Sequence, residues 1–357
     1  MHRYRRSMTG VTTLVLTLID PVTTLHAQST SSPREGRRFR ADSFWVRSWV
    51  RGGPVEPELF VEPRQLRVAD GVVFVLDLGT REVIAMDVDS GRTRFSLSAR
   101  GEGPGEFKRP ALLVGNGSQF GVLDHATSRL TLFGANGAMM RNFPIPDAAN
   151  VESACVLSGG HVLVKATGVR EAVRLIDSVG RVQFKHSLPV ADPNIVPPTF
   201  LMSANYAGPT ADDRCALVPL YGRRWFTVDT RGLLVPHPFI EPGADPTARV
   251  DTKALDKSWR GEMRRQIQTS TMSPISRGAL QVGDTLLVPA GATRRSPHRL
   301  LDYYLISSGR YLFSRRLPTT FTALAVGPNG TFFGAVIGDE TSWVIALRPA
   351  KHAAKRR

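Results

Sequence analysis

Two carboxylates stand in a glycine-rich stretch of the chain, SARGEGPGEFKRP at residues 98–110, namely Glu102 and Glu106. Glycine-rich loops bind phosphates when their backbone N–H groups converge at the start of a helix. The dinucleotide fingerprint requires a third glycine after Gly101 and Gly103, and this sequence has Glu106 there. No Gly-Lys-Ser/Thr follows, and two carboxylates would repel a polyphosphate. The stretch is therefore no nucleotide site, and its two glutamates have either an architectural or a binding role.

Residues that could perform covalent or metal-assisted catalysis are scarce. The G-x-S-x-G motif of serine hydrolases is absent, and no histidine stands beside a serine or cysteine in a recognisable motif. The eight histidines are scattered and never have the H-x-H or H-x-x-x-H spacing that would suit zinc. The adjacent carboxylates at Asp212, Asp213, Asp339 and Glu340 stand in predicted turns, where solvated loop residues are expected. The sequence thus predicts no metal site and names no catalytic group.

The chain has two cysteines, Cys155 and Cys215. In an oxidising compartment, an even number of cysteines is typical of a disulfide. Two buried free thiols are the alternative, and the sequence by itself leaves both open.

Arginines occur in short runs, an arrangement that binds carboxylates, sulfates or phosphates through paired hydrogen bonds. They fall in three segments of the chain: Arg223 and Arg224; Arg260 and Arg264; and Arg294, Arg295 and Arg299. Whether these side chains act together depends on the elements that hold them.

The N-terminal residues have the pattern of an export signal. Three arginines precede a short apolar segment at residues 8–19, and a cleavage site follows at Ala27. We therefore expect a signal peptide at residues 1–27, a disordered linker at residues 28–40, and an extracytoplasmic protein, either periplasmic or secreted. No later stretch is apolar for long enough to cross a membrane.

The 357-residue chain has a formal net charge of +15 and ends in a basic tail at residues 350–357. A basic exported protein meets anionic partners, such as a polysaccharide, another anionic ligand or an envelope protein, and contact with a membrane surface stays open. Nucleic acid is not expected, because export separates the protein from it and no nucleic-acid-binding motif has the required spacing. We expect a monomer without a cofactor.

The elements that hold these residues are short alternating strands separated by glycine turns, from about residue 62 onward. Turns recur in pairs, first at Gly71 and Gly91, and then at Gly117 and Gly137. Each repeating unit contains four strands in a meander, and six such units can be counted. Such units are typical of propeller blades. The sequence predicts an all-β fold, a six-bladed β-propeller with four-stranded antiparallel blades, over residues 41–349.

Two features complete this architecture. The last unit has only three strands, and residues 43–50 (SFWVRSWV) are predicted to supply the fourth by pairing with residues 342–347, which would leave no exposed sheet edge. An insertion at about residues 240–275 separates blades four and five. Its residues 251–268 have an apolar side chain at every fourth position, which predicts a helix. The glycine-rich stretch becomes the connection between blades one and two, with Phe107 packed between them.

The first two blades resemble a known family. The runs FVLDLGTREVIAMD, GEGPGEFKRP and GVLDHATSRLTLFGANG are similar to exported bacterial six-bladed propellers related to NHL repeats, in the TolB-like superfamily, over about residues 45–145. Asp77 and Asp124 match the aspartate position of that repeat, and Arg129 matches its basic position, whereas Glu82 departs from it.

The resemblance implies that Asp77, Asp124 and Arg129 brace loops. Some related propellers are calcium-dependent lactonases or lyases with a site in the central channel, which implies an alternative in which Asp77 and Asp124 offer oxygen ligands to calcium. Lys165, which we place at the equivalent position of blade three, argues against a cation there.

Strand order decides which loops share a face. In each meander, the loops between the second and third strands and the connections between blades emerge on one side, which we call the loop face. The arginine runs and the insertion lie in these loops. We expect a non-enzymatic propeller that binds an anionic ligand or a protein partner through a basic loop face. The alternative is a metal-dependent hydrolase or lyase, lactonase-like, with calcium in the channel.

Overall fold

The structure is a computed structural model. It describes residues 45–97, 101, 103, 105–116, 118–167, 172–187, 204–210, 212–219, 224–240, 279–290, 300–327 and 329–350. These residues form 24 β-strands and three 3-10 helices, η1 (Gly53–Val55), η2 (Ala148–Asn150) and η3 (Ser158–Gly160). None of them forms a helix that is long and apolar enough to span a membrane.

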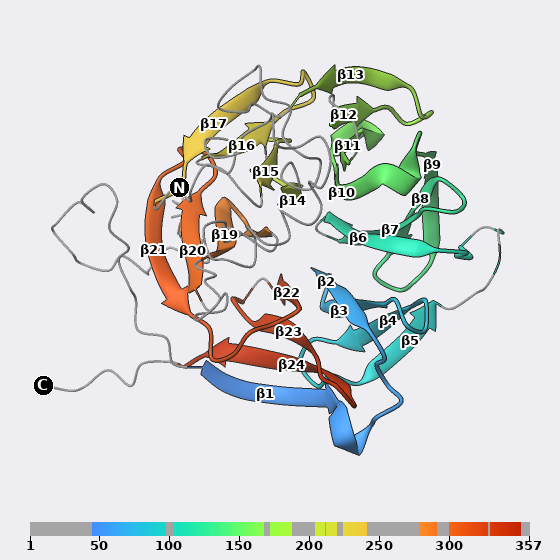
Figure 1. Cartoon of the computed structure of the whole chain (residues 1–357), viewed down its shortest axis with the longest axis vertical. Coiled ribbons are helices and arrows are strands. Elements are labelled where there is room, and N and C mark those ends of the chain that lie inside the picture. The colour runs from blue at the N-terminus through green and yellow to red at the C-terminus, as the bar shows by residue number, and fades with distance from the viewer. Residues whose placement is uncertain are drawn as a thin grey trace, which may run out of the picture. The chain divides into compact units, whose positions relative to one another are not determined.

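The strands form six sheets of four antiparallel strands each, arranged as blades around a central axis (Figure 1). The first three blades contain β2 (Pro63–Ala69), β3 (Val72–Asp77), β4 (Glu82–Asp87), β5 (Thr93–Leu97), β6 (Pro110–Asn116), β7 (Gln119–Asp124), β8 (Arg129–Gly134), β9 (Met139–Pro144), β10 (Val151–Val156), β11 (Val162–Ala166), β12 (Val173–Ile176) and β13 (Val182–His186). The other three contain β14 (Ala204–Pro209), β15 (Cys215–Pro219), β16 (Arg224–Val228), β17 (Leu234–Pro238), β18 (Leu280–Val282), β19 (Thr285–Ala290), β20 (Leu300–Leu305), β21 (Tyr311–Arg316), β22 (Ala323–Val326), β23 (Phe332–Ile337), β24 (Ser342–Pro349) and β1 (Trp45–Gly52). The predicted six-bladed all-β propeller is confirmed.

Some predicted segments lie outside the described residues. These are the signal peptide at 1–27, the linker at 28–40, nearly all of the tail at 350–357, and the helix at 251–268. The part of the chain that the structure describes contains no α-helix, so the predicted helical insertion has no counterpart there.

The burial pattern of each strand depends on its position within the blade. The second strand lies between neighbouring strands and neighbouring blades, and every residue of β3, β11 and β15 is buried. The outermost strand has one face in solvent, so β13 alternates between more and less exposed residues. The turn between β2 and β3 requires a positive φ at Gly71, which has +72°.

The hydrophobic core lies between the blades. Six clusters of buried side chains each join two neighbouring blades, and together they go once around the ring. The inner strands of neighbouring blades also contact one another all the way round, from β2 to β22 and back to β2. Phe107 belongs to the cluster between blades one and two and is 2 % exposed, as predicted for the glycine-rich connection. The ring of Phe107 lies 5.8 Å from that of Phe133.

Blade six takes its outermost strand from the N-terminal side of the chain. β1 pairs with β24 in antiparallel register, from Trp45 with Pro349 to Gly52 with Trp343. The strand also reaches blade one, because Trp49 Nε1 donates a hydrogen bond to the carbonyl oxygen of Val88 over 2.9 Å. β1 thus contacts both sides of the junction between the last blade and the first.

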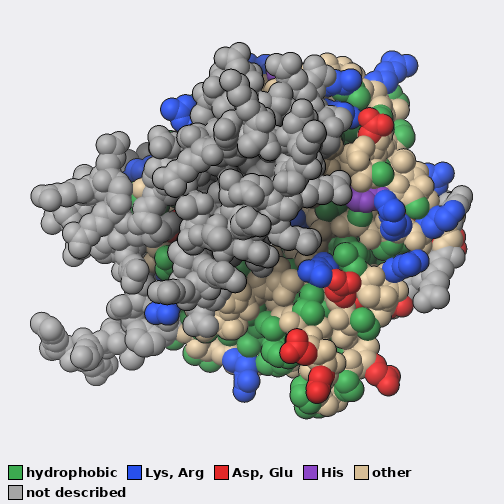
Figure 2. Space-filling model, viewed as in Figure 1, with side chains coloured by type: hydrophobic (Ala, Val, Ile, Leu, Met, Phe, Trp, Pro, Cys, Tyr) green, Lys and Arg blue, Asp and Glu red, His purple; other side chains and the backbone are tan. Residues whose placement is uncertain are grey.

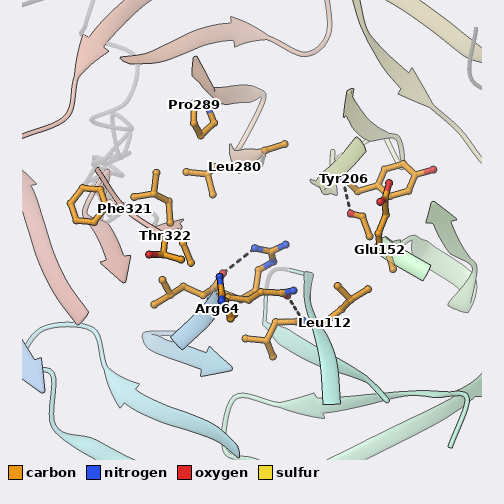
Figure 3. Close-up of a pocket in the computed structure, with 17 residues that line it drawn as sticks. Arg64, Leu112, Glu152, Tyr206, Leu280, Pro289, Phe321 and Thr322 are labelled. Carbon is orange, nitrogen blue, oxygen red and sulfur yellow. Dashed lines mark hydrogen bonds between the residues drawn. The ribbon is translucent and has the colours of Figure 1, made fainter. Parts of the chain in front are cut away.

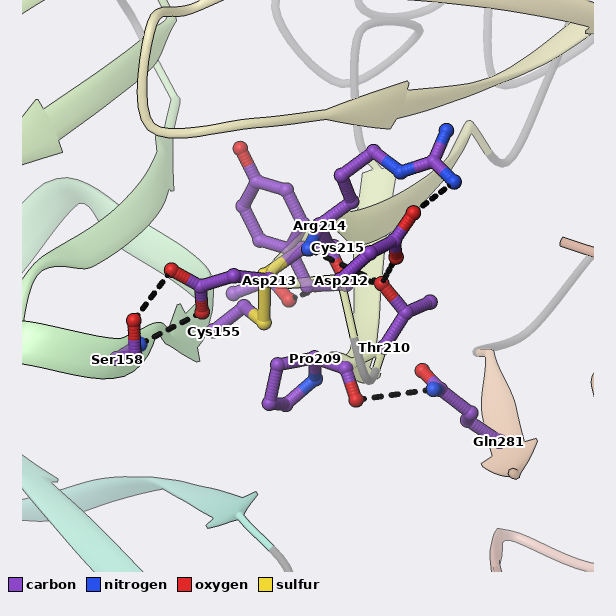
Figure 4. Close-up of a disulfide and its surroundings, with 11 residues drawn as sticks. Cys155, Ser158, Pro209, Thr210, Asp212, Asp213, Arg214, Cys215 and Gln281 are labelled. Carbon is purple, nitrogen blue, oxygen red and sulfur yellow. Dashed lines mark hydrogen bonds and ion pairs between the residues drawn. A yellow bond between two sulfur atoms is a disulfide. The ribbon is translucent and has the colours of Figure 1, made fainter. Parts of the chain in front are cut away.

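A disulfide joins blades three and four. Cys155 of β10 and Cys215 of β15 are bonded, with their Cα atoms 6.4 Å apart, and both are buried (Figure 4). This is one of the two alternatives that the sequence left open. Beside it, the backbone N–H and the hydroxyl of Ser158 donate hydrogen bonds to the Asp213 carboxylate over 2.7 and 2.6 Å. The first turns of these two blades are therefore linked covalently and by hydrogen bonds.

Candidate functional site

The two aspartates of the resemblance are buried where the second strands of blades one and two end. Asp77 accepts hydrogen bonds over 2.8–3.1 Å from the backbone N–H groups of Val61, Glu62, Gly79 and Thr80. Asp124 accepts them over 2.6–2.9 Å from those of Lys108, Arg109, Ala126 and Thr127. Each carboxylate joins the connection that enters its blade to the next turn, with both oxygens engaged. This geometry is that of a loop brace.

We expect D77N to lower the free energy of unfolding by about 2 kcal/mol. In the wild type, the charged carboxylate accepts hydrogen bonds from backbone N–H groups, whereas the amide of asparagine would turn N–H groups of its own toward some of these donors. Urea unfolding of the purified protein measures this. D70N is the matched control, since Asp70 is exposed in a turn with φ of +44°, which asparagine tolerates well. A D77N variant as stable as D70N would contradict the bracing role.

The strand register corrects one assignment made from the sequence. Asp77 and Asp124 each pair with the first residue of their inner strand, and in blade three that pairing is made by Ala166 rather than Lys165. Lys165 is shifted by one position, which turns its side chain to the other face of the sheet. It therefore gives no indication about a cation between the two aspartates.

Lys165 itself is fully buried and forms an ion pair with Glu152, with 2.8 Å between Nζ and Oε1. Its ammonium also donates a hydrogen bond to the carbonyl oxygen of Ala166 over 2.8 Å. Burial lowers the pKa of Lys165, and the neighbouring Glu152 carboxylate opposes that shift. The pair places a neutralised carboxylate on the wall of the central channel.

A cavity of about 190 Å³ occupies the channel (Figure 3). Each blade contributes to its wall, and representative residues in blade order are Arg64, Leu112, Glu152, Tyr206, Leu280 and Thr322. These residues lie in the first half of their inner strands or, for Thr322, just before the strand. Because the inner strands begin at the loop face, the cavity lies toward that face.

Two arginines of β2 line this cavity, and neither was among the candidate site residues predicted from the sequence. Arg64 is exposed, and its Nε donates a hydrogen bond over 2.8 Å to Oε1 of Glu62, with which it forms an ion pair. Arg67 is only partly exposed, and its Nη1 donates a hydrogen bond over 2.9 Å to the carbonyl oxygen of Leu66. Burial lowers the pKa of Arg67 to about 10. A guanidinium thus lies inside the channel.

Polar side chains join neighbouring inner strands within the channel. Gln65 accepts a hydrogen bond from the backbone N–H of Leu113 over 2.7 Å and so connects blades one and two. The Ser153 hydroxyl accepts one from the backbone N–H of Tyr206 over 2.8 Å and connects blades three and four. The inner strands end their sheets, so these side chains engage backbone groups that no ladder satisfies.

The residues predicted from the sequence do not gather at this cavity. Arg224 begins β16 and is exposed, Arg129 begins β8 and is exposed, and Glu106 accepts a hydrogen bond from the backbone N–H of Gly103 within its own loop over 2.9 Å. None of these described residues, nor Asp77 or Asp124, lines the cavity. The other predicted site residues lie outside the described residues: Glu102, Arg223, Arg260, Arg264, Arg294, Arg295 and Arg299.

The charges on the described surface are mixed. Figure 2 shows Lys and Arg side chains scattered over the described part of the visible face, with several Asp and Glu side chains toward its lower edge. Among the residues that the structure describes, no three His, Cys, Asp or Glu side chains form a group that could hold a metal ion.

No protein-family profile and no curated protein sequence matches the chain. Solved structures match its fold. One, from Bacteroides fragilis and assigned as an exported protein, has a TM-score of 0.54 and 11% identity and covers 87% of this chain and 95% of its own. A streptogramin B lyase has a TM-score of 0.50 and 9% sequence identity, and a DUF4221 family member from Bacteroides vulgatus has a TM-score of 0.50 and 10% identity. Each match covers 89% of this chain and 100% of the other chain. At these identities the likeness establishes a common propeller fold alone.

Proposed function

We propose that this protein is an exported, non-enzymatic β-propeller that binds an anionic polysaccharide at its loop face. The observation that supports this most directly is the cavity toward that face, whose wall carries the guanidinium groups of Arg64 and Arg67. The net charge of +15 acts in the same direction, because a basic protein attracts polyanions over several ångströms. The sequence predicts further arginine runs in loops of the same face, including Arg294, Arg295 and Arg299, and we propose that they extend the site outward.

Binding is a better account of the described residues than metal-assisted catalysis. The carboxylates that the family resemblance offered as calcium ligands are Asp77 and Asp124, and backbone N–H groups engage both oxygens of each. Moving either one onto a cation would leave buried backbone donors without an acceptor, at a cost of about 1–3 kcal/mol for each donor. Both aspartates are therefore engaged in bracing the loops of the propeller.

Export of the protein is part of the proposal. The signal-like residues 1–27 and the resemblance to exported propellers related to NHL repeats support it. The disulfide between Cys155 and Cys215 supports it too, because such bonds persist in oxidising compartments and are rare in the cytosol.

Retention on immobilised heparin, as a model polyanion, tests the loop-face arginines. We expect the triple variant R294S/R295S/R299S to elute at clearly lower salt than the wild type, because each lost cation removes a screened attraction to the polymer. The charge-matched control is R92S/R181S/R310S, whose three arginines are exposed in turns on the opposite face. Equal elution of the two variants would show that net charge alone retains the protein, and the proposed face would then be wrong.

A further inference from the structure

The side chain of Arg67 runs along the inside of the channel against the inner strand of blade two. A Cβ on Gly115 of β6 would lie 3.4 Å from Cδ of Arg67 and 3.8 Å from its Cβ and Cγ. These are ordinary van der Waals distances, so the arginine stem lies alongside β6. The backbone of Arg67 is fixed in strand β2, because Arg67 pairs with Phe74 in the middle of the β2–β3 ladder.

The charge of Arg67 has no described carboxylate as a partner. Its hydrogen bond goes to a backbone carbonyl, and none of the ion pairs among the described residues includes it. Two other described cations at or near the cavity are already balanced, Arg64 by Glu62 and Lys165 by Glu152. A guanidinium has five N–H donors and stays protonated at neutral pH. Burying such a group without an anion is unfavourable, so among the described residues of the channel wall there is one unmatched positive charge.

The channel narrows beyond this charge. Gly115 of β6 and Gly208 of β14 lie near the ends of their strands, in blades two and four, and a Cβ on Gly208 would be only 3.6 Å from the carbonyl oxygen of Gly115. The cavity is therefore a well that narrows away from the loop face. A cavity of roughly 150 Å³ holds one benzene molecule, so about 190 Å³ accommodates one six-membered ring. A polymer can place only its end in such a well.

We propose that the cavity binds the terminal uronate residue of an acidic polysaccharide, with Arg67 receiving the sugar carboxylate. This inference rests on the proposed function, because it states which part of the polyanion enters the channel. A carboxylate is a planar monoanion whose two oxygens match the parallel N–H groups of a guanidinium. One such group balances the single unmatched charge, whereas a phosphate dianion would exceed it. The hydroxyl groups of the sugar suit the backbone edges of the inner strands and Thr322.

Isothermal titration calorimetry with sodium galacturonate, and with galactose as its neutral counterpart, tests the site directly. We expect galacturonate to bind with a stoichiometry of one and galactose to bind at least about tenfold more weakly, since a charge-assisted pair is lost. Trigalacturonate should also bind one to one if only its end enters. The site is wrong if the two monosaccharides bind equally, or if galacturonate does not bind.

Three variants assign the binding to Arg67. R67Q should weaken galacturonate binding about tenfold or more, and it should be no less stable than the wild type because it removes a charge that burial disfavours. G115A keeps the charge, and its added Cβ makes only ordinary van der Waals contact with the arginine stem, so it should leave binding unchanged. R231Q is the control, because Arg231 is 79% exposed in a turn on the opposite face, and it should leave binding unchanged. Wild-type affinity in R67Q would overturn the proposal.

Dextran sulfate, which has no carboxylate, separates this inference from the proposed function. If the wild type binds dextran sulfate through the loop arginines but does not bind galacturonate, the polyanion-binding face stands and the uronate site falls. If galacturonate binds through Arg67 while dextran sulfate does not bind, the uronate site stands and the proposed binding by the loop arginines falls.

Discussion

Deletion of residues 28–52 is expected to abolish the cooperative unfolding of the propeller, rather than detach one strand from an intact ring. The deletion removes β1, which makes seven residue pairs with β24. It also removes Trp49, which is 9 % exposed in the cluster between blades six and one. Truncation of one buried tryptophan typically costs about 3–5 kcal/mol, a large part of the net stability of a domain. The deletion also exposes β24 as a free sheet edge.

Thermal unfolding followed by circular dichroism measures this effect. The control is deletion of residues 28–40, the predicted linker, which should leave the melting temperature unchanged. W49A should give an intermediate loss, because it leaves the β1–β24 ladder but removes the indole and its hydrogen bond to Val88. A melting temperature like that of the wild type after deletion of residues 28–52 would show that the ring does not need β1.

Removal of the disulfide should give the second large effect. In C155S/C215S the unfolded chain regains the freedom of a segment with a sequence separation of 60 residues, which corresponds to about 4 kcal/mol in the chain-entropy model. For a domain of this size the melting temperature should fall by roughly 5–10 °C. Both sulfur atoms are buried within the cluster between blades three and four, so serine hydroxyls there add a further cost.

The matched control is D213N, which weakens the neighbouring contact with Ser158 but leaves the disulfide in place. It should lower the melting temperature far less than the double cysteine variant. Titration of the denatured, unreduced protein with a thiol reagent should find no free thiol. Two free thiols, or equal melting temperatures of the wild type and C155S/C215S, would contradict a stabilising disulfide.

The order of the blades could be predicted because turns have strong local signals. Gly71, Gly91 and Gly137 all have positive φ in the tight turns that were predicted from the sequence. A glycine at such a position is required by the backbone itself, whatever the rest of the chain does. The spacing of these turns was enough to count six blades and to place Phe107 between two of them.

The channel residues could not be predicted in the same way. An inner strand has one face toward each neighbouring blade and one edge toward the channel, so alternation alone does not say where Arg67 points. In β2 the register also shifts between Pro63 and Gln65, which changes the phase of the strand. The same shift occurs at the start of β6 and β10, so Ala166 and not Lys165 corresponds to Asp77 and Asp124 in blade three. Bulges of this kind leave no clear signal in a single sequence.

The gathering of the arginine runs on the loop face remains a prediction. Most of them stand in loops outside the described residues, and loop conformation depends less on local sequence than strand pairing does. Arg224, the one member that the structure describes, is exposed at the start of β16. The heparin experiment with R294S/R295S/R299S is therefore the direct test of that part of the proposal.

The pairing of β1 with β24 also has a consequence for the time at which the protein can fold. β1 is the first described strand of the chain and β24 is the last, so blade six cannot be completed until synthesis has reached Pro349. Contacts between such distant parts of a chain form slowly, because a long loop must close first. A nascent chain therefore stays unclosed throughout its synthesis. If the protein is exported as proposed, this delay allows the unclosed chain to pass through a translocation pore before the propeller closes.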